Sequence, residues 1–342
     1  MLKFVHFSKW QGFGDRVPKV FPRFSSLYII IKIIYNINII IRRFDMEIIV
    51  LGAPFGEGAG VRGSEEAPRV LREMGLLNRI GRHKLVRDAG DITVPGETDF
   101  NDVNDRIYNY KRVMDFNRAV ANMAIKYAED KDFTLFLGGD HSISAGSILG
   151  RLAFFPDTAV IWMDAHADLN TDETSPSKNA HGMPLASLLW LGEERPHSIL
   201  PYIQLSKDRL FLLCQRESAL DDGEINFINE HGIFIRTWDK MRSEGVVNVF
   251  EHVFEAVEKS GANRIHLSFD IDVLRGDIVH GTGTRVGDGP DVYFVKLMMR
   301  ALAGSGRLRS MDFVEYNPRL DTDGSTGRLC LELLEEVFSH LI

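Results

Sequence analysis

Short apolar runs alternate with helical patterns over most of the chain, and this alternation limits the folds that the sequence can adopt. Eight runs have the length and composition of strands: residues 46–54, 84–91, 133–140, 158–166, 209–216, 232–238, 264–272 and 308–317. Several are apolar at successive positions, as expected of parallel strands that are covered on both faces. In the helical stretch 247–261, Val249, Val253 and Val257 recur every four residues. Repeated β-α-β order predicts a single α/β domain with three layers, in which helices cover both faces of a parallel sheet, and leaves the strand order open.

The first 45 residues differ in charge from the rest of the chain. They carry eight basic and two acidic side chains, a net charge of +6, whereas the whole 342-residue chain has a net charge of −8. Their apolar stretch Leu27–Ile41 contains Lys32 and is shorter than the ~20 residues of a membrane-spanning helix. Three interpretations stay open: residues 1–45 precede a natural start at Met46, form a targeting segment, or form a structural arm. We expect the folded, functional domain to cover residues 46–342.

Cysteine usage and net charge exclude several classes of protein. Cys214 and Cys330 are too few for a disulfide framework, which favours a reduced, cytoplasmic protein, or a mitochondrial one if residues 1–45 are a transit segment. The net charge of −8 argues against non-specific binding to nucleic acid.

Polar clusters follow three of the predicted strands, each at its carboxyl end. They are GGDHS (138–142), DAHAD (164–168) and SFDID (268–272). Open α/β sheets bind their ligands at the carboxyl ends of the strands. In the second cluster the two acids and the histidine lie two residues apart, so an extended chain directs all three to one side. The two acids of the third cluster repeat this spacing.

The residue types in these clusters favour a pair of metal ions. Packed together without a cation, the carboxylates would repel one another and take up protons. Carboxylate and imidazole ligands without thiolate suit Mn, Fe, Co or Zn and argue against a structural zinc site. Four carboxylates and two neutral imidazoles balance two divalent cations. Six ligands suffice for two ions only if some bridge them, and ions about 3.5–4 Å apart would share a hydroxide, as in two-metal hydrolases.

Taken together, the three clusters resemble the metal motifs of the ureohydrolase family, which comprises arginases, agmatinases and their relatives. The resemblance extends from about Met46 to the C-terminus. It implies a domain around an eight-stranded parallel sheet, two Mn²⁺ ions per subunit and a homotrimer or hexamer. Asp164 and Asp270 would bridge the ions, and Asp140 would lie beside the ligands without binding metal. The six implied ligands are His141, Asp164, His166, Asp168, Asp270 and Asp272.

Other positions of the chain match the substrate-binding residues of arginases. In the loop that ends in HGMP, His181 would exchange protons with solvent, although outside this motif it would be an ordinary surface histidine. Glu315, in VEYNP, would bind the guanidinium bidentately. Without the resemblance, the Ser- and Asn-rich loop is simply a turn, and Asp221 and Glu224 are acids at a helix N-terminus. The resemblance assigns the α-carboxylate to Asn170, Ser175, Ser177 and Asn179, the α-amino group to Asp221 and Glu224, and the floor of the site to Thr284.

The resemblance implies hydrolysis of L-arginine to L-ornithine and urea by a metal-bridging hydroxide, with Asp168 carrying a proton to the leaving amine. The HGMP-like loop favours a substrate with an α-carboxylate, hence arginine over agmatine. Three alternatives stay open: an agmatinase or another enzyme of guanidino compounds, a non-catalytic relative, and a deacetylase of similar fold. The loop and Glu315 do not suit the deacetylase.

Two departures from the family pattern lie near the predicted site. Val273-Leu274-Arg275-Gly276 stands where most relatives have Gly-Leu-Asp-Pro, and Lys178 replaces a usual glycine. An inward-pointing Arg275 would weaken the metal cluster or repel a cationic substrate. We expect its side chain to point away from the cluster.

Overall fold

The computed structural model describes residues 46–94, 106–192 and 199–342, so the three interpretations of residues 1–45 lie outside it. All eight predicted strands are present in the described residues, and they form one parallel sheet. The strands are β1 (Glu47–Ala53), β2 (Leu85–Asp91), β3 (Phe133–Gly138), β4 (Thr158–Met163), β5 (Leu210–Leu213), β6 (Phe234–Arg236), β7 (Arg264–Asp270) and β8 (Leu308–Val314).

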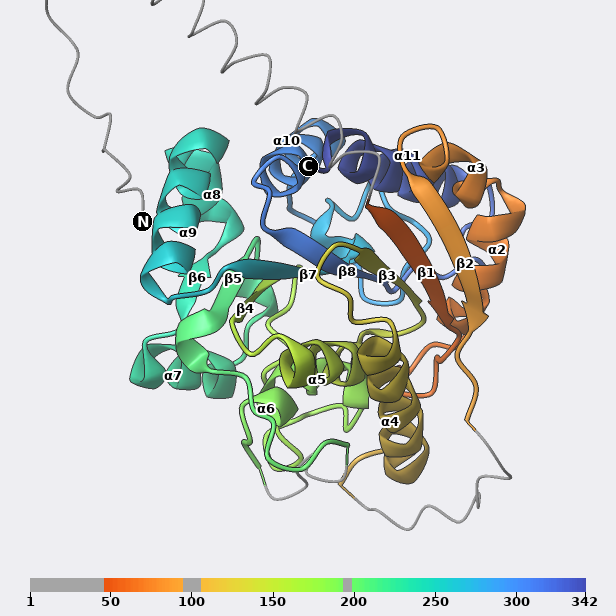
Figure 1. Ribbon diagram of the computed structural model, residues 1–342. Helices are drawn as coiled ribbons and strands as arrows, with labels where there is room; N and C mark the ends of the chain where they lie inside the picture. Colours follow the sequence, from red (N-terminus) through yellow and green to blue (C-terminus); the bar gives the residue numbers. More distant parts are fainter. Residues whose placement is uncertain (1–45, 95–105, 193–198) are drawn as a thin grey trace, which may run out of the picture. The chain divides into compact units, whose positions relative to one another are not determined.

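The order of the strands across the sheet is β2-β1-β3-β8-β7-β4-β5-β6 (Figure 1). The last strand of the chain, β8, therefore lies between β3 and β7. Its register pairs Thr134 of β3 with Ser310 and Ser268 of β7 with Asp312. This order gathers β3, β7 and β4, the strands that precede the three polar clusters, at the centre of the sheet.

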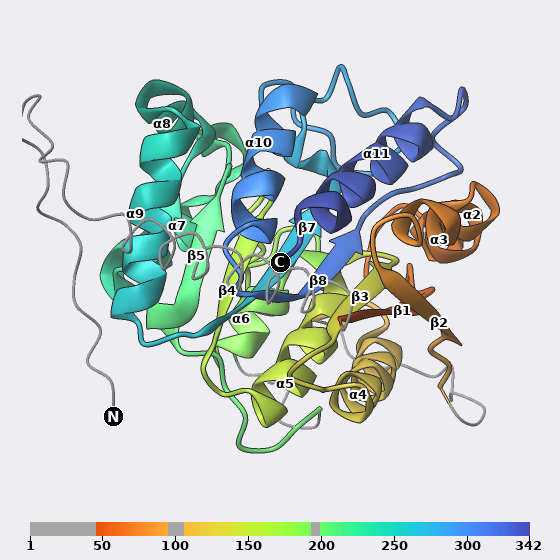
Figure 2. The same cartoon turned by 45° about the horizontal axis from the view of Figure 1, so that its top comes forward.

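Helices cover both faces of the sheet, as predicted (Figures 1 and 2). One face is covered by α4, α5, α6 and α7, and the other by α2, α3, α8, α9, α10 and α11. Their bounds are α2 (Ala67–Glu73), α3 (Leu76–Ile80), α4 (Tyr110–Lys126), α5 (Ser144–Phe154), α6 (Pro184–Leu188), α7 (Asp222–His231), α8 (Trp238–Glu244), α9 (Val246–Lys259), α10 (Val292–Ala303) and α11 (Ser325–His340). Within the described residues, none of these helices has the length and apolar character needed to cross a membrane.

Alternate residues of the central strands enter two separate cores. In β4, Ile161 and Met163 pack with α9 and α10, whereas Val160 and Trp162 pack with α5 and α6. All four side chains are fully buried. Burying a large apolar side chain contributes about 1.5–3 kcal/mol, so a strand that is apolar at every position stabilises both layers.

The predicted valine spacing in α9 is confirmed, because Val249, Val253 and Val257 are all fully buried against the sheet. The segment between β1 and β2, in contrast, forms two short helices, α2 and α3. Gly75 separates them with a φ of 92°, a conformation that glycine adopts without a steric penalty.

The loops that carry the polar clusters are fixed by short 3-10 turns. Asp140 precedes the turn His141–Ile143, and its side chain accepts a hydrogen bond from the amide of Ser142. Asp270 likewise precedes the turn Ile271–Val273 and accepts a hydrogen bond from the amide of Asp272. Each strand thus ends in a capped turn that holds the following side chains at the carboxyl edge of the sheet.

Candidate metal centre

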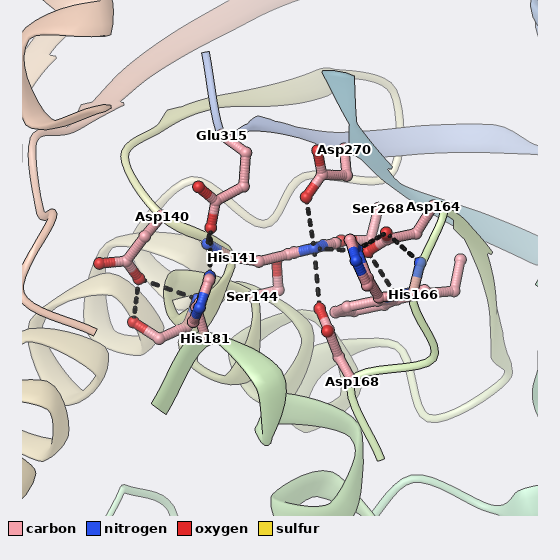
Figure 3. Close-up of polar contacts among 12 residues, drawn as sticks. Asp140, His141, Ser144, Asp164, His166, Asp168, His181, Ser268, Asp270 and Glu315 are labelled. Atoms are coloured by element: carbon pink, nitrogen blue, oxygen red, sulfur yellow. Dashed lines mark hydrogen bonds and ion pairs between the residues drawn. The ribbon is translucent and has the colours of Figure 1, made fainter. Parts of the chain in front are cut away.

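The six predicted metal ligands lie together at the carboxyl edge of the sheet, and all of them except Asp272 are labelled in Figure 3. They come from three segments: the turn after β3, the loop after β4, and the end of β7 with the turn that follows. All are buried except His166, whose side chain is 27% exposed. The two groups that could each hold a metal ion are His141, Asp164 and Asp168, and Asp164, His166 and Asp272.

In the first group, three carboxylate oxygens surround Nδ1 of His141. The nitrogen lies 2.9 Å from Oδ2 of Asp164, 3.1 Å from Oδ2 of Asp168 and 3.3 Å from Oδ2 of Asp270. Although it is buried, this nitrogen has no hydrogen bond of good geometry to any partner. Four potential ligand atoms that converge without hydrogen bonds to one another form the arrangement that a cation would satisfy.

In the second group, Nδ1 of His166 lies 3.4 Å from Oδ1 of Asp164 and 3.2 Å from Oδ2 of Asp272. Asp164 therefore directs one oxygen towards each group, as a bridging ligand must. Asp270 approaches the first group, and its other oxygen accepts the amide of Asp272. These distances place the predicted ligands close together. That they bind metal ions stays a prediction.

The charges of the cluster fit two divalent cations. Burial and the neighbouring carboxylates raise the pKa of Asp270 well above its usual value. Burial, with the charge of Asp164, also raises the pKa of Asp168 to about 6. It is therefore unfavourable for these buried carboxylates to be close together as anions, and bound divalent cations would offset their repulsion. Carboxylate oxygen and imidazole nitrogen, without thiolate, are the ligands that suit Mn²⁺ and similar ions.

Trp162 holds two of the predicted ligands in place. Its ring stacks on the imidazole of His141 with 3.9 Å between centroids and an angle of 7° between planes. Its Nε1 donates a hydrogen bond to Oδ2 of Asp164 at 3.1 Å. A fully buried indole therefore holds a histidine ring and a carboxylate of the same group in place.

Glu315 and His181 lie together beside the cluster (Figure 3). Oε1 of Glu315 accepts the amide of His141 at 2.8 Å and lies 3.0 Å from Nδ1 of His181. Burial lowers the pKa of His181, but the charge of Glu315 outweighs this effect and raises the pKa to about 9. Oε2 of Glu315 makes no hydrogen bond to the described residues, so one oxygen of this buried carboxylate stays available to a ligand.

Asp140 lies outside the cluster and supports a loop instead. Its side chain accepts the amide of Gly58 at 2.8 Å, and the carbonyl of Gly58 accepts the amide of His181 at 3.1 Å. The structure thus gives this carboxylate a role in positioning the segment that carries His181.

The loop between β4 and α6 carries the residues predicted to bind an α-carboxylate. Oγ of Ser175 accepts the amide of Lys178, and Oγ of Ser177 accepts the amide of Asn179. Asn170 donates to Oδ2 of Asp221 at 2.7 Å. The loop therefore contains the turns expected from its Ser and Asn residues. That these residues bind an α-carboxylate stays a prediction.

Asp221 and Glu224 form a capping box at the start of α7. The helix N-terminus expected without the resemblance is thus confirmed. Oε1 of Glu224 also accepts the amide of Leu169, next to Asp168, at 3.1 Å. Thr284 donates from Oγ1 to Oδ2 of Asp272 at 3.0 Å, so it supports a predicted ligand.

Arg275 does not approach the cluster. Its guanidinium pairs with Asp277, and its side chain is 43% exposed. The expectation that it points outward is confirmed.

Arg216 is a supporting residue that the motifs do not reveal. It is 3% exposed and donates to the carbonyl of Asp288 and to those of Asp272 and Val273. It thereby ties the turn that carries Asp272 to the loop before α10. Its only signal in the sequence is a basic residue at the end of the predicted strand 209–216.

Two residues of the site have backbone conformations that non-glycine residues seldom adopt. Asp168 has a φ of 51° and Glu315 a φ of 64°. Such conformations cost about 1–3 kcal/mol and persist where the surrounding structure enforces them, which is common at functional sites.

Comparison with known proteins gives one consistent result. The Arginase family matches residues 46–339. Arginase from Bacillus subtilis strain 168 is 36% identical over 294 residues, which cover 86% of this chain and 98% of that protein. The native arginase structure from Bacillus caldovelox has a TM-score of 0.80 at 34% identity and covers 86% of this chain and 98% of that one. Arginase from Entamoeba histolytica, in complex with L-ornithine, has a TM-score of 0.79 at 31% identity and covers 86% of this chain and 99% of that one.

Proposed function

This chain belongs to the arginase family, and we propose that it hydrolyses L-arginine to L-ornithine and urea. It is an arginase-type hydrolase that acts on a guanidino C–N bond. The observation that carries the proposal is the contact of Glu315 with both His141 and His181. This contact puts a buried carboxylate, with one oxygen available, directly beside the predicted metal ligands.

The cluster would hold two Mn²⁺ ions, with His141 and Asp168 at one ion, His166 and Asp272 at the other, and Asp164 and Asp270 shared. The two oxygens of Asp164, directed towards different histidines, support this division. When bound, the ions would supply a water that is activated near neutral pH.

The side chains around the cluster would position the substrate and move its protons. Glu315 would bind the guanidinium and orient its carbon towards the cluster before reaction, which lowers the entropic cost of the attack. Asp168 would pass a proton to the leaving nitrogen, and His181, which is 17% exposed, would exchange protons with solvent.

An α-amino acid substrate is favoured over agmatine by the loop between β4 and α6. Its hydroxyl and amide groups at Asn170, Ser175, Ser177 and Asn179 would face an α-carboxylate, which agmatine lacks. Asp221 and Glu224 would face the α-amino group, and Thr284 would support the floor of the site through Asp272.

The decisive experiment measures urea release from L-arginine by the full chain loaded with Mn²⁺, with agmatine in parallel and with bound metal quantified. We expect urea from arginine alone and about two metal ions per chain. Urea from agmatine alone would replace the proposed substrate. Bound metal without urea from either compound would remove the proposed activity.

Replacing His181 with asparagine is expected to lower kcat about 100-fold, because a positioned proton-transfer group contributes at least that factor. His181 is outside the metal cluster, so bound Mn²⁺ should stay unchanged. Steady-state kinetics and metal analysis of His181→Asn test both parts, and an unchanged kcat would exclude His181 from proton transfer.

Three further assignments complete the proposal. Residues 46–342 would be the catalytic domain, with residues 1–45 an extension or outside the native protein, and the family match over residues 46–339 supports this boundary. The enzyme would assemble as a homotrimer or hexamer. Its buried free thiols at Cys214 and Cys330 support a cytoplasmic location, or a mitochondrial one if residues 1–45 are a transit segment.

A further inference from the structure

A row of polar side chains lies buried beneath the predicted metal ligands, between the sheet and α5. We call it the buried polar seam. Adjacent strands β7 and β8 pair His266 with Ser310 and Ser268 with Asp312. None of the seam residues is more than 1% exposed: His266, Ser268, Ser310, Asp312, Ser144 and Ser147. Polar groups are costly at such depth unless their hydrogen bonds are satisfied, so the direction of each bond matters.

Asp312 receives most of the hydrogen bonds in the seam. Its Oδ2 accepts Ser147 Oγ at 2.8 Å and Ser268 Oγ at 3.3 Å, and it lies 3.0 Å from Nε2 of His266. Burial raises the pKa of Asp312, but His266 and the serine hydroxyls outweigh burial and hold the pKa below its usual value. Asp312 is therefore a carboxylate, which can only accept hydrogen bonds.

The carboxylate of Asp312 decides where the hydroxyl proton of Ser268 points. Ser268 Oγ lies 2.9 Å from Nε2 of His141 (Figure 3). Because a hydroxyl has a single proton and Asp312 accepts it, the oxygen of Ser268 is left to accept the N–H at Nε2. Oγ of Ser144 lies 3.1 Å from Oγ of Ser268 and can donate a hydrogen bond to it. This bond leaves the hydroxyl proton of Ser268 directed at Asp312. The lone pair of His141 then resides on Nδ1, which faces Asp164, Asp168 and Asp270.

We propose that Asp312 is a positioning residue which, through Ser268, keeps the ring proton of His141 on Nε2 and leaves Nδ1 free to bind a metal ion. Asp312 touches no predicted metal ligand. Trp162, stacked on the same ring, fixes the plane of His141, so Asp312 and Trp162 together set the orientation and the tautomer. The inference rests on the proposed metal centre. Partners of this kind typically change metal affinity 10–100-fold when they are removed.

Two serine substitutions give a matched test. Ser268→Ala and Ser147→Ala each remove a buried hydroxyl that donates to Oδ2 of Asp312, but only Ser268 contacts His141. Competition with a fluorescent chelator would measure Mn²⁺ affinity of the full chain. We expect Ser268→Ala to weaken binding of the first ion tenfold or more, and Ser147→Ala to weaken it less than about twofold. Equal effects of the two variants would overturn the inference.

Substitutions at Asp312 test the residue itself. Asp312→Leu has no acceptor and should weaken Mn²⁺ binding at least as much as Ser268→Ala. Asp312→Asn keeps one acceptor oxygen and should recover part of the affinity. If Asp312 only stabilised the fold, the loss of Mn²⁺ affinity in each variant would follow its loss in Tm. The inference instead requires Asp312→Asn to bind Mn²⁺ more tightly than Asp312→Leu, whatever the change in Tm.

A spectroscopic measurement provides a readout independent of turnover. In the Co²⁺-loaded protein, the Nε2 proton of His141 should give a hyperfine-shifted ¹H NMR signal that disappears in D₂O. We expect this signal to be unchanged in Ser147→Ala and shifted or broadened in Ser268→Ala and Asp312→Leu. If the wild-type chain binds no metal, the metal centre itself fails. If it binds metal and the signal is the same in every variant, only the role of Asp312 fails.

Discussion

Asp168→Asn is expected to lower the rate of urea formation about 1,000-fold. The substitution removes a negative charge 3.1 Å from Nδ1 of His141 and removes the carboxylate proposed to pass a proton to the leaving nitrogen. A positioned general acid or base contributes about 100- to 10,000-fold. Asparagine has nearly the same size, so the loss reflects chemistry and not packing. Single-turnover urea formation with saturating L-arginine measures the effect directly.

Metal analysis separates the two contributions of Asp168. If the variant retains about two ions per chain, the loss belongs to proton transfer, and if it retains fewer, ligand loss contributes. Asp132→Asn is a suitable control, because Asp132 is also a buried carboxylate but accepts the amide of Glu47, away from the cluster. Activity of Asp168→Asn within tenfold of wild type would contradict the proposed mechanism.

Glu315→Gln is expected to lower kcat/KM for L-arginine by about 100- to 10,000-fold. Two hydrogen bonds from the guanidinium to Oε2, the oxygen of Glu315 that stays available, would contribute about 1.5–3 kcal/mol each, and the neutral amide would also direct an N–H towards the cationic guanidinium. Glu315 lies outside the two ligand groups, so metal content should stay the same. The loss should appear in kcat as well as KM, because the carboxylate also orients the reacting carbon.

Glu315→Asp provides the matched comparison, since it keeps the charge and withdraws the carboxylate by one methylene. We expect it to retain more activity than Glu315→Gln. If Glu315→Gln kept kcat/KM within tenfold of the wild-type value, the guanidinium would have to be bound elsewhere.

The strands and the predicted ligands could be read from the sequence because both depend on local patterns. Runs such as 158–163 are apolar on both faces, and the acids that follow them stand at period two. The strand order could not be read, since nothing local to β8 shows that it lies between β3 and β7. The role of Ser268 is hidden for the same reason. It reads as one polar residue in a buried strand until the register of β7 and β8 sets Asp312 opposite it.

Asp221 and Glu224 illustrate a different limit. Their spacing is correct for a capping box, which the structure contains, and also for the family's amino-group segment. Both interpretations use the same atoms, so sequence pattern alone could not choose between them. The sequence motif does not by itself set the direction of the Arg275 side chain. That direction depends on the ion pair with Asp277 that the structure shows.

The central place of the last strand has a consequence for how the enzyme is made. Within the described sheet, β8 is the only strand that joins β2-β1-β3 to β7-β4-β5-β6. On the ribosome, the nascent chain can pair strands within each half, but the halves stay unjoined until β8 has emerged. His141 belongs to one half, and Asp164 and Asp270 to the other. Assembly of the predicted centre is thus a late, non-local event, of the slow kind expected for distant parallel pairing. Premature termination before β8 would yield a chain that contains all six predicted ligands but does not hold His141 beside the other five.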